Sequence, residues 1–363
     1  MTPLACEVFG YQLPLTAPLR IGAHLLSVRR GLIIRIADGD GCCGHGEVAP
    51  LPGLHKEDLT TALAQFLAVR EPLRRQRLPE APADLPNDFA HWLGHYDLCP
   101  TLRYGLEMAV LNLLACRRQC TLAALLNPSY RNVLPITGLL IESDNLATQA
   151  RRLLRQGYTT IKLKVGRQSL AEDIARVRFV RQTFGTAVKL RLDANRSWDF
   201  PSAVQFGKAV RDCNIGYIEE PLINPRQCSD FYKTTAIPVA LDESLSDWRA
   251  EIREVPEGVN TFILKPAVLG GIEMTMRFVQ LARRQRIQAV ISSTFESGVG
   301  LAALANYAAA LMDGQVPAGL DTYRWLRADL PIKRFTAPGG KVAVDSVYSQ
   351  TQRLRNQRLK RLL

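Results

Sequence analysis

Thr160-Ile-Lys-Leu-Lys-Val-Gly166 contains the first of five short apolar stretches in the second half of the chain that end in charged residues. The charged residues are Lys162 and Lys164, Asp193, Glu219, Asp242 and Lys265. Counted from Lys164, successive ones are 29, 26, 23 and 23 residues apart. Such an interval is the length of one strand plus one helix. Because parallel barrel strands open their C-terminal ends on one face, the spacing predicts three carboxylates and three lysines grouped there.

The fold class that this periodicity predicts is α/β. Eight candidate strands alternate with helical patterns, at residues 133–140, 159–164, 188–193, 217–219, 239–242, 261–265, 288–292 and 318–321. We therefore predict a (β/α)8-like barrel of the modified (β/α)7β kind. The structural alternative is a doubly wound open sheet, which would place functional groups at one switch point instead of around a ring of strand ends.

The first part of the chain lacks this repeat and predicts an α+β capping domain. Short strands with turns between them are expected at 13–15, 31–36 and 46–48, and apolar residues at helical spacing predict helices at 56–69 and 101–116. The predicted domains are a capping domain at 1–128, completed by residues 328–363, and a catalytic barrel at 129–327.

The composition is that of a globular protein, with 363 residues, 47% hydrophobic content and no apolar run long enough to cross a membrane. Residues 1–20 lack the pattern of a signal peptide, so we expect a cytoplasmic protein whose eight cysteines are reduced. Residues 351–363 hold five of the cations behind the formal charge of +12. We interpret them as a frayed basic tail whose deletion leaves catalysis intact, and the remaining charge suits an anionic small-molecule substrate.

Two short motifs suggest other functions and are set aside. Gly39-Asp-Gly-Cys-Cys-Gly44 matches a dinucleotide-binding pattern, but the chain continues as a strand where that site needs the start of a helix. A glycine-rich hairpin is the better interpretation. His91 and His95 have helical spacing, yet no glutamate lies between them as in a zinc protease, so we expect no zinc site there.

Three carboxylates at successive strand ends predict a metal site. Asp193, Glu219 and Asp242 would repel one another strongly unless a cation lay between them. Ligands that are all oxygen favour Mg²⁺, with Mn²⁺ as a second option, over Zn²⁺. The alternative is that each carboxylate pairs with a neighbouring lysine or arginine.

The lysine pair predicts a general base. Lys162 and Lys164 are two apart in one strand, so both side chains point to the same face, which in a barrel strand is the interior. A neighbouring ammonium and a divalent cation would both lower a lysine pKa toward neutrality. With Lys265 facing them, this arrangement suits proton abstraction beside a carboxylate through a metal-stabilised enediolate.

Five motifs together resemble the enolase superfamily, and within it the muconate-lactonising subgroup. They are the stretch at 160–166, Leu192-Asp-Ala-Asn195, Ile218-Glu-Glu-Pro221, Leu241-Asp-Glu-Ser244 and Leu264-Lys-Pro266. The subgroup carries K-x-K on the second barrel strand and a lysine on the sixth. All five histidines lie at or before His95, which argues against the mandelate-racemase type with its barrel histidine.

Three further stretches resemble the o-succinylbenzoate synthases, one family of that subgroup, and the likeness covers about residues 10 to 325. They are Gly46-Glu-Val-Ala-Pro-Leu-Pro-Gly53, Ile291-Ser-Ser-Thr-Phe-Glu-Ser-Gly298 and Gly319-Leu-Asp-Thr322. This resemblance implies a step of menaquinone or phylloquinone synthesis, the syn dehydration of 2-succinyl-6-hydroxy-2,4-cyclohexadiene-1-carboxylate to o-succinylbenzoate.

The resemblance also implies residue roles. Lys164 would remove the proton and then protonate the departing hydroxide, Lys162 would tune it, and Lys265 would stabilise the anion. Asp193, Glu219 and Asp242 would bind the metal, supported by Asn195 and Glu220. Ser292, Ser293 and Gly319 would contact the succinyl tail, and the loop at 16–20 would close over the site.

Two alternative functions stay open. An N-succinylamino-acid racemase or a dipeptide epimerase would use the same barrel, metal and lysines, although Leu320-Asp-Thr322 has one aspartate where dipeptide epimerases carry Asp-x-Asp. A basic non-catalytic protein that binds nucleic acid would explain the net charge but not the strand-end charges. We expect a small anionic carboxylate substrate and no nucleic-acid or membrane partner, and the sequence predicts no oligomeric state.

Overall fold

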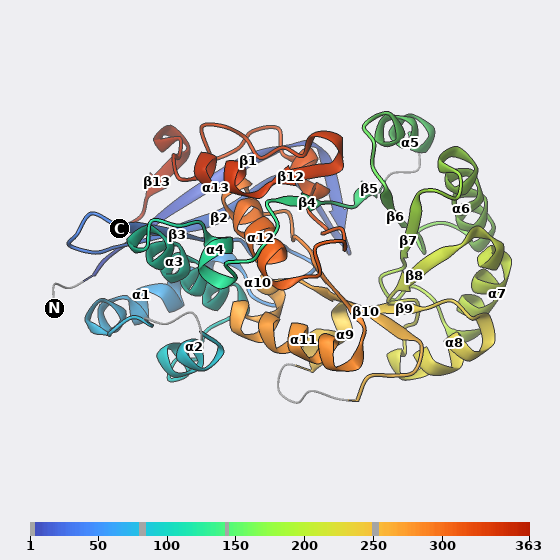
Figure 1. Cartoon of the computed structure of the whole chain (residues 1–363), viewed down its shortest axis with the longest axis horizontal. Helices are drawn as coiled ribbons and strands as arrows, with labels where there is room; N and C mark the ends of the chain where they lie inside the picture. Colours follow the sequence, from blue (N-terminus) through green and yellow to red (C-terminus); the bar gives the residue numbers. More distant parts are fainter. Residues whose placement is uncertain (1–3, 80–84, 142–144, 249–253) are drawn as a thin grey trace.

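The computed structural model describes residues 4–79, 85–141, 145–248 and 254–363. Figure 1 shows an antiparallel sheet with its helices at one end of the molecule and a curled parallel sheet, wrapped by helices, at the other. The chain termini lie together at the antiparallel end. No helix in the described ranges is both long enough and apolar enough to span a lipid bilayer.

The antiparallel part, called the cap here, is built on β1 (Ala5–Ile21), β2 (His24–Ala37) and β3 (Cys43–Val48). Four helices accompany these strands, α1 (Leu59–Arg75), α2 (Leu85–Leu93), α3 (Pro100–Arg117) and α4 (Leu122–Leu126). A Cβ on Gly44 would lie 2.0 Å from the carbonyl oxygen of Ala109 in α3, and one on Gly46 would lie 1.8 Å from that of Gly105. The glycine-rich stretch therefore lets α3 pack against β3, as a hairpin and not a nucleotide site.

The parallel part is a seven-stranded sheet in the order β11-β10-β9-β8-β7-β6-β5. Its strands are β5 (Gly138–Leu140), β6 (Thr160–Lys164), β7 (Lys189–Asp193), β8 (Ile215–Glu219), β9 (Val239–Leu241), β10 (Val259–Leu264) and β11 (Gln288–Ile291). Segment 318–319 joins the two edges through the bridges Ile136↔Ala318 and Ser292↔Gly319. The predicted barrel is confirmed, with an eighth strand reduced to this bridging segment.

The predicted first strand at 133–140 is wrong in one respect, because it is two strands. β4 (Val133–Pro135) pairs antiparallel with β12 (Lys341–Ala343), and only β5 belongs to the barrel sheet. The break lies at Ile136 and Thr137, whose backbone N–H groups donate to Gly340 and Ala318 instead of to one partner strand. One apolar run therefore serves two sheets.

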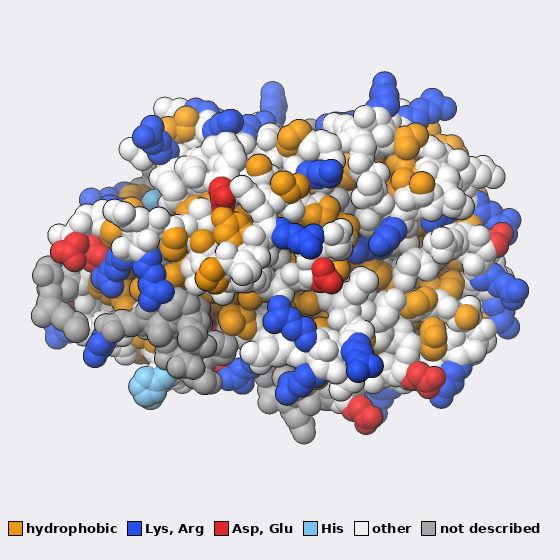
Figure 2. Space-filling model, viewed as in Figure 1, with side chains coloured by type: hydrophobic (Ala, Val, Ile, Leu, Met, Phe, Trp, Pro, Cys, Tyr) orange, Lys and Arg blue, Asp and Glu red, His pale blue; other side chains and the backbone are white. Residues whose placement is uncertain are grey.

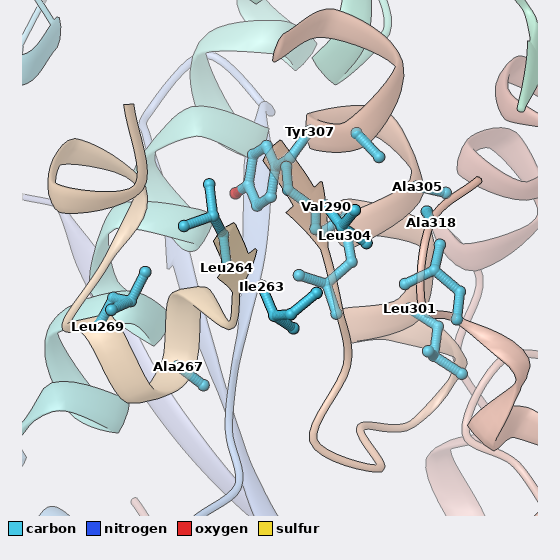
Figure 3. Close-up of a cluster of buried hydrophobic side chains, with 14 of the residues drawn as sticks. Ile263, Leu264, Ala267, Leu269, Val290, Leu301, Leu304, Ala305, Tyr307 and Ala318 are labelled. Atoms are coloured by element: carbon cyan, nitrogen blue, oxygen red, sulfur yellow. The ribbon is translucent and has the colours of Figure 1, made fainter. Parts of the chain in front are cut away.

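Helices follow the barrel strands and cover the outside of the sheet (Figure 1). They are α5 (Leu146–Arg155), α6 (Leu170–Phe184), α7 (Phe200–Val210), α8 (Cys228–Thr235), α9 (Glu243–Asp247), α10 (Pro266–Leu269), α11 (Ile272–Gln285) and α12 (Gly298–Leu311). Helix α12 is buried along its whole length. Figure 3 shows Tyr307 of this helix beside Leu264, and Leu304 beside Val290 of the barrel strands. Because α12 also contacts β3 of the cap, it is a core element between barrel and cap.

The basic tail is ordered, which corrects the expectation that it is frayed. After α13 (Val344–Thr351), the segment β13 (Leu359–Arg361) pairs with β1 and extends the cap sheet. Arg361 forms an ion pair with Glu7 at 2.8 Å, and Leu362 lies over Gly10. The return of the tail to the cap sheet agrees with the proposed domain assignment, although the boundaries at 128 and 327 stay a prediction.

Deleting residues 357–363 is expected to lower the free energy of unfolding by about 2 kcal/mol, because each strand hydrogen bond contributes about 1 kcal/mol. We expect kcat to stay unchanged, since no residue of this segment lines the cavity described below. Urea unfolding and turnover of the truncated protein would test both statements. Arg361→Ala, which removes only the exposed ion pair, should cost less than about 1 kcal/mol. Wild-type stability after truncation would show that β13 is frayed in solution.

Candidate active site

A cavity of about 560 Å³ lies at the C-terminal ends of the barrel strands, between barrel and cap. Its barrel wall includes Lys162, Lys164, Asp193 and Lys265, and the cap contributes residues 19–22, 51, 53 and 54. The predicted closing loop at 16–20 thus reaches the cavity through Leu19 and Arg20, at the end of β1. This arrangement places a site between two structural units, where ligands commonly bind.

Strand register brings the charged residues to one level. Lys164 lies opposite Asp193, and Asp193 lies opposite Glu219, in the pairs β6–β7 and β7–β8. The other three predicted strand-end charges lie close by, because Lys162 contacts Asp193 and Glu219, and Lys265 contacts Asp242 and interacts with the charge of Glu219. All six residues are called the charged cluster here. Its three carboxylate residues are at most 5% exposed.

The lysines of the charged cluster lie between its carboxylates. Lys162 Nζ is 3.0 Å from Asp193 Oδ2 and 3.1 Å from Glu219 Oε2. Lys164 Nζ is 2.6 Å from the same Asp193 oxygen, and Lys265 donates a hydrogen bond to Asp242 Oδ2. The pairing of carboxylates with lysines, which was the alternative to a metal site, is present in this structure.

The donor chemistry of the cluster fits a hard divalent cation, because Asp193, Glu219 and Asp242 offer oxygen atoms only. Burial and the charge of Asp193 raise the pKa of Glu219 well above its usual range, although Lys162 lowers it. Additional positive charge would therefore stabilise ionised Glu219. Among the residues that the structure describes, no group of three Asp, Glu, His or Cys side chains is arranged to hold one ion. Lysine ammonium groups contact the carboxylate oxygens instead.

The two lysines of β6 differ in their expected protonation. Burial lowers the pKa of Lys164, with further lowering by Lys162, and these effects outweigh the opposing charge of Asp193. For Lys162, burial is opposed by Glu219 and Asp193, and the net result is a pKa well above its usual range. The predicted depression is therefore assigned to Lys164 alone, which makes Lys164 the better proton acceptor of the pair.

Comparison with known proteins identifies the family. Residues 145–347 match the family model described as Enolase C-terminal domain-like, and residues 4–113 match MenC, N-terminal domain. The o-succinylbenzoate synthase of Edwardsiella ictaluri is 33% identical over 328 residues, covering 89% of this chain and 91% of that protein. The chain belongs to the o-succinylbenzoate synthase family. The family member from Yersinia enterocolitica is 30% identical, with 89% and 92% covered.

Other relatives of this o-succinylbenzoate synthase family member are similar in part or in fold. Protein PHYLLO of Arabidopsis thaliana is 33% identical over 83% of this chain, which spans only 20% of that longer protein. The L-Ala-D/L-Glu epimerase of Bacillus subtilis superposes with a TM-score of 0.80 over 94% of this chain and 96% of its own, at 23% identity. At that identity the likeness establishes the fold and nothing further about activity.

Two supporting residues were predicted, and both contact the charged cluster. Asn195 accepts a hydrogen bond from Lys164 Nζ at 2.6 Å and donates to Glu243 at 3.0 Å. Glu220 accepts from the backbone N–H of Asp242 at 2.9 Å and from Arg196 at 3.1 Å. Asn195 and Glu220 have left-handed φ angles of 45° and 43°, so the chain turns sharply where these strands end.

The residues predicted to contact a substrate tail also line the cavity. Ser292, Ser293 and Gly319 lie on one wall, where the Ser293 hydroxyl donates to the Gly319 carbonyl at 3.1 Å and lies 2.6 Å from the Thr322 hydroxyl. A Cβ on Gly319 would lie 2.4 Å from Ser292 Oγ, so this close contact requires glycine.

The sequence analysis missed two cations of the cavity wall, Arg167 and Arg191. Arg191 donates to Thr137 Oγ1 at 2.9 Å, and its guanidinium lies 5.2 Å from the ring centre of Tyr217. It lies two residues before Asp193 in β7, so the alternation rule that grouped the two lysines would have placed it in the interior as well. No comparable signal marks Arg167, which follows the end of β6.

His55, in the cap loop beside the cavity, predicts acid sensitivity. Its Nδ1 accepts from the Leu51 N–H at 2.9 Å, and burial is the main cause that lowers its pKa to about 4. In the unfolded chain the imidazole of His55 takes up a proton near pH 6.5. The contribution of neutral His55 to the free energy of unfolding is therefore fully present above pH 6.5 and is lost as the pH falls toward 4.

We expect His55→Gln to flatten the fall in the free energy of unfolding between pH 6.5 and 4, by at most about 1.4 kcal/mol per pH unit. Urea unfolding at several pH values measures this slope. His24→Gln, at an exposed position in β2, should leave the slope unchanged. Equal slopes in His55→Gln and wild type would contradict the assignment.

Proposed function

We propose that this chain is a metal-dependent o-succinylbenzoate synthase that dehydrates 2-succinyl-6-hydroxy-2,4-cyclohexadiene-1-carboxylate. The observation that carries the proposal is Lys164, a lysine of lowered pKa that lines the cavity beside Asp193, together with Lys265. Family membership supports the same reaction. We further propose that it acts in the cytoplasm, in keeping with eight free cysteines.

We propose that Asp193, Glu219 and Asp242 hold Mg²⁺, with Mn²⁺ as a substitute, as the enolase-superfamily resemblance implies. Bound there, the ion would supply positive charge for the enediolate that forms when the substrate loses its α-proton. Glu220 fixes the backbone of Asp242, and Asn195 holds Lys164 Nζ through a hydrogen bond. These hydrogen bonds orient Asp242 and Lys164 within the charged cluster.

In the proposed reaction, Lys164 removes the proton next to the ring carboxylate as the neutral amine. Its ammonium then gives that proton to the departing hydroxide on the same face, which leaves the aromatic product and returns the amine. Lys162, whose pKa is raised, stays charged beside Lys164 and thereby keeps the Lys164 pKa low. Lys265 would stabilise the anion from the opposite side of the cavity.

The dipeptide epimerase alternative is disfavoured by the environment of Asp321. Its Oδ1 accepts from the Tyr158 hydroxyl at 2.8 Å, and its Oδ2 accepts from the Leu139 N–H at 2.9 Å and from Arg324. Asp321 is 1% exposed. Because Arg324 already neutralises this carboxylate, it is a poor partner for the ammonium of a dipeptide.

The racemase alternative requires a second lysine that exchanges protons. Burial disfavours the charge of Lys265, but Asp242 and Glu243 outweigh it and raise the Lys265 pKa above its usual range. Lys265 is therefore expected to stay protonated, which suits a dehydration with one base better than a racemisation with two. This favours dehydration as the principal activity.

The nucleic-acid alternative finds little support on the surface. On the face shown in Figure 2, Lys and Arg side chains are scattered among other residues instead of forming one continuous stripe. A basic protein that binds nucleic acid would normally gather them along one groove or helix. A small carboxylate substrate within the cavity accounts for the buried lysines more directly.

Loss of the diene absorbance of the hydroxycyclohexadiene carboxylate, measured with Mg²⁺ and with excess chelator, tests the proposal. Turnover that depends on the metal is the expected result. A wild-type protein that leaves this substrate unchanged but exchanges the α-proton of N-succinylamino acids would replace the dehydratase with the racemase.

A further inference from the structure

The cavity wall that carries Ser292 and Ser293 is fixed by the cap. This wall is the loop of residues 292–297 between β11 and α12, and Thr294 and Phe295 also line the cavity. Three adjacent cap strands each provide one buried side chain to a shared network around the loop, Tyr11 of β1, Arg29 of β2 and Glu47 of β3. We call this network the cap–loop contact.

Arg29 is the centre of the cap–loop contact. It is 2% exposed and donates to five backbone carbonyl oxygens. On the barrel side, its Nε donates to Phe295 at 3.0 Å and its Nη2 to Thr294 at 3.3 Å. On the cap side, its guanidinium donates to Pro50 at 2.7 Å and also to Ala49. One planar group therefore joins the cap loop that follows β3 to the barrel loop that follows β11, and both loops reach the cavity.

Glu47 holds the other end of the same loop. Its carboxylate accepts from the Ser297 N–H at 2.8 Å, the Ser297 hydroxyl at 2.7 Å and the Gly300 N–H at 2.7 Å. These donors belong to the first turn of α12, where a negative charge is stabilising. The Tyr11 hydroxyl donates to the remaining position on Glu47. The carboxylate is 1% exposed and is fully used within the fold.

The geometry requires an arginine at position 29. Burying a cation is costly unless it is hydrogen-bonded throughout, and here neutral carbonyl groups supply the bonds. The described part of the chain shows no carboxylate in direct contact with Arg29. A lysine would keep the charge but lacks the planar fork of donors that reaches both loops at once. Such a contact fixes distances between two loops more than it provides charge.

We propose that Arg29 and Glu47 are positioning residues that hold the wall for the substrate's succinyl tail at the correct distance from the charged cluster. Tail recognition is thus fixed by the cap, although the contacts themselves are made by barrel residues. The inference rests on the proposed function, because it takes the tail to be succinyl. Neither residue touches the reacting atoms.

The test compares two ligands of the Mg²⁺-loaded full-length protein by calorimetry, o-succinylbenzoate, which has the tail, and benzoate, which lacks it. Small misplacements of positioning groups strongly weaken recognition. We therefore expect Arg29→Lys to weaken the binding of o-succinylbenzoate at least about tenfold and to leave the affinity for benzoate unchanged. In turnover, KM should rise more than kcat falls. Arg30→Lys, at the adjacent exposed position of β2, is the control and should match wild type.

Glu47→Gln provides the second variant, since an amide cannot accept hydrogen bonds at its nitrogen. We expect this variant also to bind o-succinylbenzoate more weakly and to bind benzoate as wild type does. Equal weakening of both ligands, or no change for either, in the variants that fold would overturn the inference. Failure of both variants to fold would also overturn it, because the two residues would then be determinants of folding. If wild type itself does not bind o-succinylbenzoate, the proposed function fails instead.

Discussion

Lys164→Ala is expected to lower kcat for the diene dehydration by about 10²- to 10⁴-fold, the range that a positioned general acid–base contributes. The loss should lie near the upper end, because Lys164 is proposed to remove the proton and to return it to the leaving hydroxide. Alanine removes the amino group that lies 2.6 Å from Asp193, yet Lys162 still contacts that carboxylate at 3.0 Å. The variant should therefore fold and bind substrate.

Initial rates of loss of the diene absorbance, measured with Mg²⁺ at saturating substrate, give kcat. Circular dichroism checks the fold. Lys189→Ala is the matched control, since Lys189 is an exposed lysine at the opposite end of β7, the neighbouring strand. Its turnover should equal that of wild type. If Lys164→Ala retained more than a tenth of wild-type turnover, Lys164 would not be the base, and Lys162 would be the next residue to test.

The charged cluster could be predicted from the sequence because it depends on local geometry. Alternation within a strand placed Lys162 and Lys164 on one face, and the strand–helix interval placed Asp193, Glu219 and Asp242 at one level. The structure brings these residues together as expected. The interval could not predict the difference in pKa between the two lysines, because that difference depends on the contacts of each Nζ atom. Lys162 lies 3.0 Å from Asp193 and 3.1 Å from Glu219, whereas Lys164 lies 2.6 Å from Asp193.

The parts that were missed depend on contacts between distant segments. Arg29 bonds with residues that follow it by more than 260 positions, and β13 pairs with a strand near the opposite end of the chain. Neither periodicity nor composition contains such a partner. The basic tail illustrates the difficulty, since a short run of cations has the same composition whether it is solvated or added to a sheet edge.

Glu219→Gln is expected to weaken Mg²⁺ binding by at least about 100-fold, since supporting residues of metal sites alone contribute 10- to 100-fold. Glutamine keeps the shape of the side chain, but its oxygen carries no net charge. A buried cation would therefore lose its electrostatic attraction to one ionised carboxylate. Calorimetric titration of the metal-free protein with Mg²⁺ measures the loss without reference to turnover. Glu220→Gln, one residue along, should weaken binding by only about tenfold because Glu220 acts through the backbone of Asp242.

The thermal response to the metal gives a second readout. Glutamine removes a proposed metal ligand, and it also removes the contact of Glu219 with Lys162 at 3.1 Å. The increase in Tm that Mg²⁺ is expected to cause in wild type should therefore disappear in Glu219→Gln. Glu107→Gln, which replaces a buried carboxylate between α3 and α11, should keep the wild-type response to Mg²⁺. A Glu219→Gln protein that binds Mg²⁺ as tightly as wild type would remove Glu219 from the proposed ligands.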